Sequence, residues 1–156
     1  MNELHANTSL HNSRYAIQKT LGQGGFGITY LAYDNVNRKQ VAIKEFFMKE
    51  LCNRNGKTRH MSVPSTGSRK LVDKFRAKFL KEANTIANLS HPNIIKIYDI
   101  FEENATAYYA MEYISGGSLA DLLEKEPEKR FCEVDALHYL RQVAGALNYI
   151  HMLGIN

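Results

Sequence analysis

The sequence is short of cysteine and of long apolar runs, and these two absences exclude several classes of protein. Cys52 and Cys132 lie 80 positions apart, which suits neither a disulfide framework nor a metal site, so we expect reduced thiols. No stretch approaches the roughly 18 uncharged apolar residues that a membrane-spanning helix needs. Residues 1–14 are polar and lack the apolar centre of a signal peptide. We therefore expect a short flexible leader in a cytoplasmic protein.

The charge of the chain is unevenly distributed. Residues 49–81 contain ten Lys and Arg but two acidic residues, a charge of +8, whereas the remainder carries −4 and the whole chain +4. A basic strip can attract phosphate groups, nucleic acid or an acidic partner, although a solvated loop and helix face is the simpler interpretation. No aromatic residues alternate with these bases, which argues against nucleic acid. An acidic or phosphorylated protein is therefore the candidate partner for the strip.

Apolar periodicity predicts an α+β fold in which strands and helices are segregated. The first three strands are joined by short connections, which favours an antiparallel meander. A polar segment at 48–68 interrupts the pattern and is typical of an inserted loop. The expected strands are 15–21, 26–33, 40–47, 94–101 and 106–113, and the expected helices are 69–89, a short one between Ser118 and Pro127, and 133–153.

Residues 22–27 read Gly-Gln-Gly-Gly-Phe-Gly and match the phosphate-binding pattern G-x-G-x-x-G. Glycines let backbone N–H groups approach a phosphate closely, although such a run can also be a hairpin turn without a ligand. A dinucleotide-binding loop would open into a helix, and a Walker-type loop would continue with Lys and then Ser or Thr. Here an alternating strand follows, at 28–33. Among these ligand-binding loops, the pattern fits one that covers nucleotide phosphates between two antiparallel strands.

Lys44 ends the run Val-Ala-Ile-Lys in the third expected strand, 22 residues after Gly22. A lysine in an apolar strand is costly unless its ammonium group finds an anion. The phosphates of ATP would supply one partner, and the carboxylate of Glu82, in the middle of the expected helix, would supply another. The alternative for Glu82 is a surface ion pair with Lys78 one turn earlier. With Lys44 present, we favour the pair between Lys44 and Glu82.

In this order and spacing, the motifs resemble those of protein serine/threonine kinases, most of all bacterial ones, from Tyr15 to Asn156. The resemblance implies an ATP-binding N-lobe at 15–114, built from a five-stranded antiparallel sheet and one regulatory helix. It implies that 115–156 hold the hinge and two helices of an incomplete C-lobe. In such kinases, the Lys44–Glu82 pair orients the phosphates of ATP for transfer to a protein hydroxyl.

The resemblance also assigns a nucleotide-binding site. The adenine would lie between Leu21 and Thr29, although kinases usually have valine at the position of Thr29. The tip of the glycine loop would cover the phosphates, Met111 would be the gatekeeper, and the hinge backbone would bind the adenine edge. The implied ATP-binding residues are Leu21, Gly22, Gln23, Gly24, Gly25, Phe26, Gly27, Thr29, Ala42, Lys44, Met111, Glu112, Ile114 and Ser118.

The sequence contains neither the His-Arg-Asp nor the Asp-Phe-Gly motif of the family. These motifs supply the catalytic base and the ligands of Mg²⁺, so we expect no metal ligands here and negligible phosphoryl transfer by this chain alone. We interpret the chain as a truncated kinase whose full-length parent uses ATP, Mg²⁺ and a protein substrate. The alternative is a catalytically inactive kinase-like scaffold or interaction module.

Overall fold

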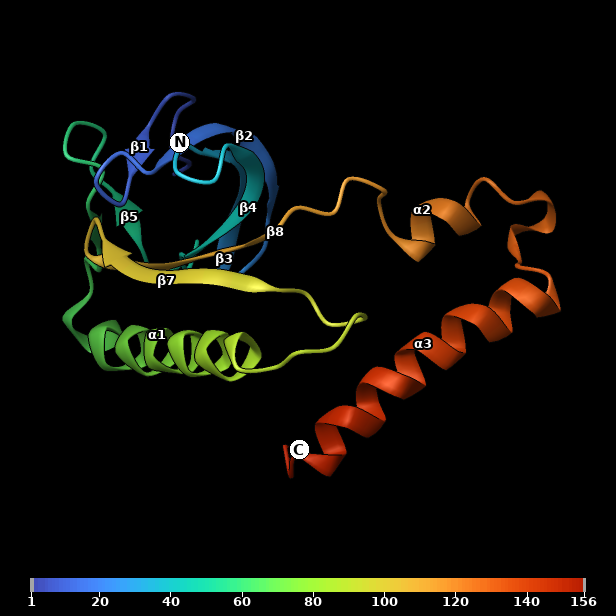
Figure 1. Cartoon of the computed structure of the whole chain (residues 1–156). Helices are drawn as coiled ribbons and strands as arrows, with labels where there is room; N and C mark the ends of the chain where they lie inside the picture. Colours follow the sequence, from blue (N-terminus) through green and yellow to red (C-terminus); the bar gives the residue numbers. More distant parts are fainter. Residues whose placement is uncertain (1, 156) are drawn as a thin grey trace. The chain divides into compact units, whose positions relative to one another are not determined.

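A computed structural model describes residues 2–155, which fold into two compact units (Figure 1). The first unit contains the chain up to Asn88 together with Lys96–Tyr113, and the second contains Leu89–Ile95 and the chain from Ile114 onward. The predicted N-lobe, residues 15–114, includes residues 89–95. In the structure this segment packs with the helices of the second unit instead.

The first unit is built on one curved antiparallel sheet, which confirms the α+β class (Figure 1). The order of the strands is β1-β2-β3-β4-β8-β7, so the sheet has six strands rather than the five expected. The additional strand, β1, lies at the edge beside β2. The strands are β1 (Ser9–Leu10), β2 (Tyr15–Gln23), β3 (Gly27–Asp34), β4 (Lys39–Phe46), β7 (Ile97–Glu103) and β8 (Thr106–Glu112).

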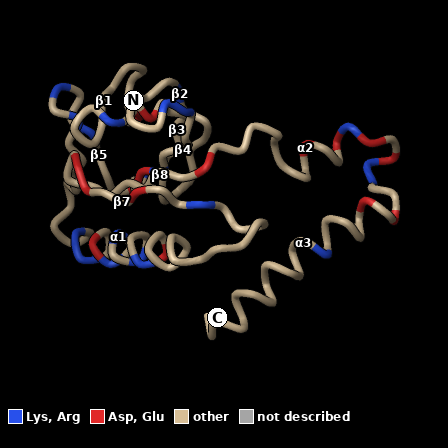
Figure 2. Tube along the Cα trace, in the orientation of Figure 1, with Lys and Arg blue, Asp and Glu red and all other residues tan. Residues whose placement is uncertain are grey.

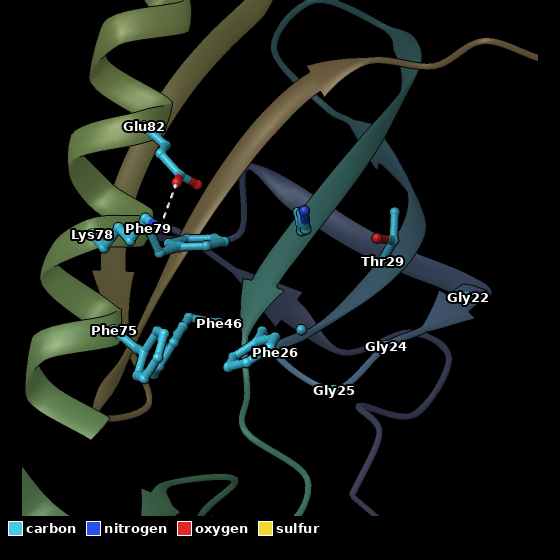
Figure 3. Close-up of a pocket in the computed structure, with 12 residues that line it drawn as sticks. Gly22, Gly24, Gly25, Phe26, Thr29, Phe46, Phe75, Lys78, Phe79 and Glu82 are labelled. Atoms are coloured by element: carbon cyan, nitrogen blue, oxygen red, sulfur yellow. Dashed lines mark ion pairs between the residues drawn. The ribbon is translucent and has the colours of Figure 1, made fainter. Parts of the chain in front are cut away.

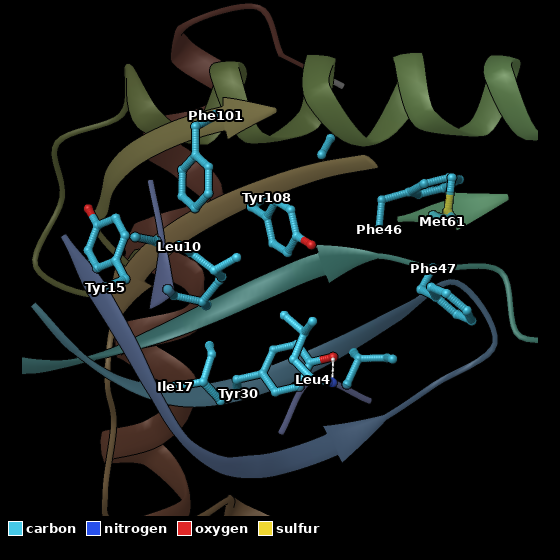
Figure 4. Packing of buried hydrophobic residues seen from close by; sticks show 14 of the residues in the cluster. Leu4, Leu10, Tyr15, Ile17, Tyr30, Phe46, Phe47, Met61, Phe101 and Tyr108 are labelled. Atoms are coloured by element: carbon cyan, nitrogen blue, oxygen red, sulfur yellow. Dashed lines mark hydrogen bonds between the residues drawn. The ribbon is translucent and has the colours of Figure 1, made fainter. Parts of the chain in front are cut away.

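The expectation of a flexible N-terminal leader is wrong. Leu4 and Leu10 are buried in the main core, and the backbone N–H of Leu4 donates to the hydroxyl of Tyr30 at 3.1 Å (Figure 4). The backbone N–H of Asn7 donates to the carbonyl of Ile17 at 2.8 Å. The segment has too few apolar residues to show a periodicity in the sequence. Leu4 and Leu10 are nevertheless enough to attach it to the core.

The main core lies on one face of the sheet, because side chains alternate between the two faces of each strand. Ile28 and Tyr30 of β3 meet Val41 and Ile43 of β4 in this core. Three aromatic rings from β2, β7 and β8 also pack in this core. The ring of Phe101 stacks on that of Tyr15 at 5.7 Å and on that of Tyr108 at 5.2 Å (Figure 4). The opposite face of β4 carries Ala42 and Lys44.

The inserted loop is more ordered than its sequence indicates. It forms a small hairpin of β5 (Asn53–Arg54) and β6 (Met61–Ser62), and Cys52 and Met61 are buried in the main core. The loop leads into α1 (Thr66–Ala87), which begins three residues earlier and ends two residues earlier than expected. Phe79 of α1 packs its ring against the sheet, 5.0 Å from Tyr109. This packing places α1 along β7 and β8 (Figure 1).

The second unit is helical. It contains α2 (Leu119–Leu123), a single 3-10 turn at Pro127–Lys129, and α3 (Glu133–Met152). The ring of His91 stacks on that of Tyr149 in α3 at 5.4 Å, and the hydroxyl of Tyr149 accepts a hydrogen bond from the backbone of Ser90 at 3.1 Å. These contacts attach residues 89–95 to α3. Among the helices of residues 2–155, none is both long enough and apolar enough to span a bilayer.

Candidate functional site

A cavity of the first unit lies between the glycine loop, strand β4 and helix α1 (Figure 3). Its volume is about 510 Å³. It brings together seven of the residues that the sequence predicts for nucleotide binding, and Glu82 lies at its α1 side. The residues that line it are Gly22, Gly24, Gly25, Phe26, Gly27, Thr29, Lys44, Phe46, Phe75, Lys78, Phe79 and Glu82.

The glycine loop joins β2 to β3, two antiparallel neighbours in the sheet. The backbone N–H of Gly24 donates to the carbonyl of Gly27 at 2.9 Å and closes the turn. A Cβ atom added at Gly24 or Gly25 would meet no atom within 4 Å, so crowding does not require glycine at either position. A strand follows the loop, which rules out a dinucleotide-binding or Walker-type loop in this place.

Gly27 is required by a close approach of two strands. A Cβ atom on Gly27 would lie 2.7 Å from the backbone carbonyl oxygen of Glu45 on β4. Contacts this short do not occur in relaxed proteins, so any larger residue would push β3 and β4 apart. The same Cβ atom would lie 3.7 Å from Cε of Lys44. The end of the glycine loop therefore rests directly on the part of β4 that carries Lys44.

Lys44 is the lysine that the sheet contributes to the lining of the cavity. It lies opposite Thr29 in the register of β3 and β4, and its side chain is half-buried. Its Nζ is 6.0 Å from the centre of the Tyr109 ring, and within residues 2–155 it forms no ion pair. An ammonium group that faces a cavity beside a glycine loop is suited to an anion such as a phosphate.

The expected ion pair between Lys44 and Glu82 is absent from the structure. The carboxylate of Glu82 lies instead 3.8 Å from Nζ of Lys78, the partner one turn earlier, and both side chains are mostly exposed (Figure 3). Phe79 explains the difference, because its ring fills the space between α1 and the sheet, 5.7 Å from Phe46. Glu82 therefore stays at the surface of α1, although it lines the same cavity as Lys44.

Aromatic side chains form the wall of the cavity at the tip of the glycine loop. The ring of Phe26 lies 5.1 Å from that of Phe75 on α1, and Phe26 is still 56% exposed (Figure 3). The backbone of the loop tip is also tied to the sheet, since the N–H of Phe47 donates to the carbonyl of Phe26 at 3.1 Å. Phe75 and Phe79 were not among the residues predicted for the site. Their four-residue spacing in the expected helix, which puts both on one helix face, was the available signal.

The remaining predicted residues lie outside this cavity. Ala42 is buried opposite Met111 in the register of β4 and β8, and the backbone N–H of Glu112 donates to the carbonyl of Lys96 at 2.9 Å. Leu21 and Gln23 are exposed on β2 but do not line the cavity.

Ile114 and Ser118 belong to the second unit and are described there. Ile114 is exposed. The hydroxyl of Ser118 accepts a hydrogen bond from the N–H of Asp121, and the carboxylate of Asp121 accepts one from the N–H of Ser118. This reciprocal capping box starts α2, as the sequence predicts. Hence Ser118 has a structural role in the second unit that does not depend on a ligand.

Glu45, the neighbour of Lys44, is a buried polar residue that the sequence analysis missed. Its side chain is fully buried and accepts hydrogen bonds from the hydroxyls of Tyr30 at 2.8 Å and Tyr108 at 2.6 Å. The guanidinium of Arg54 donates to the same carboxylate at 2.6 Å. Burial, followed by the charge of Glu45, raises the pKa values of both tyrosines well above the ordinary value. Both hydroxyls therefore remain protonated donors.

Within residues 2–155, no group of three or more His, Cys, Asp or Glu side chains is placed to hold a metal ion. The chemistry that the cavity offers is thus a lysine, the backbone of the glycine loop and an aromatic wall. This set can bind an anionic ligand and exclude water from part of it.

Comparisons with known proteins agree with this geometry. The serine/threonine-protein kinase PksC of Streptomyces coelicolor is 30% identical over 157 residues, which cover 97% of this chain and 25% of PksC. The serine/threonine-protein kinase PknD of Chlamydia trachomatis is 30% identical over 151 residues, or 91% of this chain and 14% of PknD. The chain thus spans a quarter or less of these relatives.

Solved structures show the same fold. The apo form of PpkA-294 matches with a TM-score of 0.86 and 30% identity, over 99% of this chain and 54% of that one. The kinase domain of Mycobacterium tuberculosis PknI matches with a TM-score of 0.70 and 22% identity, over 97% of this chain and 53% of that one. The family description "Protein kinase domain" fits residues 15–156. With this match, and with the glycine loop and Lys44 in one cavity, the chain belongs to the protein kinase family.

Proposed function

We propose that this chain is the ATP-binding portion of a serine/threonine protein kinase. The observation that carries the proposal is the common cavity of the glycine loop and Lys44. The backbone N–H group of Gly25 would face the phosphates of ATP, and the ammonium group of Lys44 would neutralise part of their charge. A lysine that faces a cavity without a carboxylate partner favours this function over that of a scaffold, which would need neither feature.

Glu82 would enter the site only after a local change. To pair with Lys44, its carboxylate would leave Lys78 and turn past Phe79 into the cavity. The pair with Lys78 is exposed and contributes little free energy, so it is a weak obstacle. We propose that nucleotide phosphates, by holding Lys44 in place, favour the pair of Lys44 with Glu82 in the ligand-bound chain.

The experiment compares ATP binding by the wild-type chain and by Lys44→Met, using isothermal titration calorimetry. Loss of a charged hydrogen-bond donor to phosphate should weaken binding about ten-fold or more. Lys39→Met is the matched control, because Lys39 is on the same strand but its Nζ lies over the ring of Tyr98, 3.7 Å from the centre. Equal affinities of all three chains would remove Lys44 from the site, and the proposed function with it.

The activity of the whole protein is part of the proposal. The parent would transfer the γ-phosphoryl group of ATP to a serine or threonine hydroxyl of a protein substrate. Mg²⁺ would accompany the nucleotide and neutralise charge on its phosphates, with ligands other than those of this chain. A cytoplasmic location remains a prediction from the sequence.

The basic strip is proposed as a contact for an acidic or phosphorylated partner. Lys and Arg residues recur along α1 and in the β5–β6 hairpin (Figure 2). Arg69, Lys70 and Lys74 are exposed and form no ion pair within residues 2–155, whereas Arg76 donates to the carbonyl of Ala105. Reversing the charge of these three residues should weaken binding of a phosphorylated peptide; unchanged binding would refute the contact.

A further inference from the structure

Arg54 connects three segments that are distant in sequence. Its guanidinium donates to the carboxylate of Glu45 on β4 at 2.6 Å, to the carbonyl of Asn2 at 2.6 Å and to the carbonyl of Arg59 at 2.9 Å. The Arg54 side chain is only 4% exposed. One buried side chain therefore ties the N-terminal segment and the β5–β6 hairpin to the strand that carries Lys44.

The acceptor of this ion pair is itself fully enclosed. Two tyrosine hydroxyls donate to Glu45, and each hydroxyl accepts a hydrogen bond in turn: that of Tyr30 from the N–H of Leu4, and that of Tyr108 from the side-chain amide of Asn104 at 3.0 Å. Within residues 2–155, no buried side-chain polar atom lacks a partner. A fully satisfied network of this kind holds its members in one arrangement.

The network lies directly behind the nucleotide cavity. Neighbouring residues of a strand point to opposite faces, so Glu45 faces the core while Lys44 faces the cavity. The backbone carbonyl of Glu45 is the atom on which Gly27 rests. The guanidinium of Arg54 lies 5.0 Å from the centre of the Phe47 ring, and the N–H of Phe47 holds the carbonyl of Phe26 at the loop tip.

From this arrangement we propose that Arg54, through Glu45 and Phe47, is a positioning residue that sets the glycine loop and the Lys44 strand for nucleotide binding. Arg54 does not touch the cavity; it acts on β4 from the core side. The N-terminal segment contributes by giving Arg54 its second acceptor, at Asn2. The inference about affinity rests on the proposed ATP site, whereas the inference about backbone position does not.

A second arginine provides the matched control. Arg14 also pairs with a fully buried carboxylate, that of Asp34 at 3.2 Å, at the end of β3 far along the strand from the glycine loop. Arg14→Met and Arg54→Met each leave a buried carboxylate without its cation, so both should lower the melting temperature. Only Arg54→Met removes a link to the cavity.

Hydrogen exchange of the nucleotide-free 156-residue chain, followed by mass spectrometry, tests the position of the backbone. Arg54→Met should speed exchange about ten-fold in residues 27–29 and 43–47, whereas Arg14→Met should do so only near residues 14–17 and 33–36. Titration with ATP should then show about ten-fold weaker binding by Arg54→Met and near wild-type binding by Arg14→Met. A uniform rise in exchange through the first unit in both variants would overturn the proposal. Unchanged exchange of Arg54→Met in residues 27–29 and 43–47 would overturn it as well.

Arg54→Lys keeps the test decisive if Arg54→Met does not fold. Lysine retains the charge beside Glu45 but has a single nitrogen, so it cannot serve three acceptors in a fixed fork. We expect intermediate exchange in residues 43–47, and wild-type exchange there would contradict the three-way link. If the wild-type chain does not bind ATP, the proposed function fails, but the exchange comparison still decides whether Arg54 positions the strand.

Discussion

Glu82 and Lys78 form an ion pair across one turn of α1, with 3.8 Å between carboxylate oxygen and ammonium nitrogen, on the wall of the cavity that Lys44 also lines. In this arrangement the helix carboxylate lies at the surface while Lys44 remains available to an anion. The arrangement therefore separates the two charges that the sequence analysis expected to meet.

Removing this surface pair should hardly change stability. We expect Lys78→Ala to alter the free energy of unfolding by less than about 0.5 kcal/mol, because exposed pairs across one helical turn contribute little. Urea denaturation followed by circular dichroism measures the change. A loss of about 2 kcal/mol or more would show that the pair is far stronger than its exposure indicates.

Gly27→Ala should destabilise the sheet, because the new Cβ atom would lie 2.7 Å from the carbonyl oxygen of Glu45. Relieving that overlap requires β3 and β4 to separate, at a cost of about 1 to 3 kcal/mol. Gly25→Ala is the control in the same loop, since its Cβ atom would meet nothing within 4 Å. Thermal denaturation of both variants gives the comparison, and equal melting temperatures would contradict the close approach.

Acid should weaken the first unit through Asp34. Burial alone would raise the pKa of Asp34, but hydrogen bonds from Arg14 and Asn37 outweigh it and lower the pKa from 3.8 to about 2. Because the folded-state pKa is lower than the unfolded one, this contribution is fully present above about pH 4 and is lost as pH falls toward about 2. It should amount to on the order of 2 kcal/mol.

The pH dependence of urea denaturation tests the role of Asp34. In Asp34→Asn the fall in stability between about pH 4 and pH 2 should be shallower, because one titrating carboxylate has been removed. A wild-type slope in this variant would assign the acid sensitivity to other groups.

Ser118→Ala should loosen α2 without affecting the first unit. The variant loses the hydroxyl that accepts from the N–H of Asp121, and such a cap contributes about 1 kcal/mol. Faster hydrogen exchange in residues 119–123 is the expected signal. Ser115→Ala, just before the cap, should leave exchange there as in the wild type, and the same exchange in both variants would argue against the capping box.

The two thiols should differ in reactivity. Cys52 is buried and Cys132 is exposed, and burial raises the pKa of the Cys52 thiol. Because the thiolate is the reactive species, a disulfide reagent should modify one thiol per native chain and two in denaturant. Fast modification of both thiols in the native chain would mean that the main core opens around Cys52.

The sequence predicted the placement of the glycine loop beside Lys44, because that placement depends on local order. A glycine run between two alternating segments can only be a loop between strands, and Lys44 in the next strand must then lie beside it. The first expected strand, observed as β2, begins at Tyr15, and the third, observed as β4, ends at Phe46; both positions are within one residue of expectation. Gly22, Thr29 and Lys44 line one cavity, whereas their roles in nucleotide binding stay predictions.

The ion pair of Lys44 with Glu82 was not predictable in the same way. It depends on how far α1 lies from the sheet, and that distance is set by the ring of Phe79 against Tyr109 rather than by the spacing of charges. The role of Arg54 was hidden for a similar reason, since its acceptors at Asn2 and Glu45 come from separate segments. One signal was available: Glu45 falls on the apolar face of its strand, with Val41 and Ile43.

Strand β1 has a practical consequence for the boundaries of this domain. The family match begins at Tyr15, yet Ser9 and Leu10 pair with the outer side of β2 and shield its backbone groups. A chain trimmed to residue 15 would present that row of donors and acceptors to any neighbouring molecule, and sheets of separate molecules join edge to edge in this way. A chain that begins at Tyr15, where the family match begins, should therefore self-associate, whereas a chain that keeps the first fourteen residues should not.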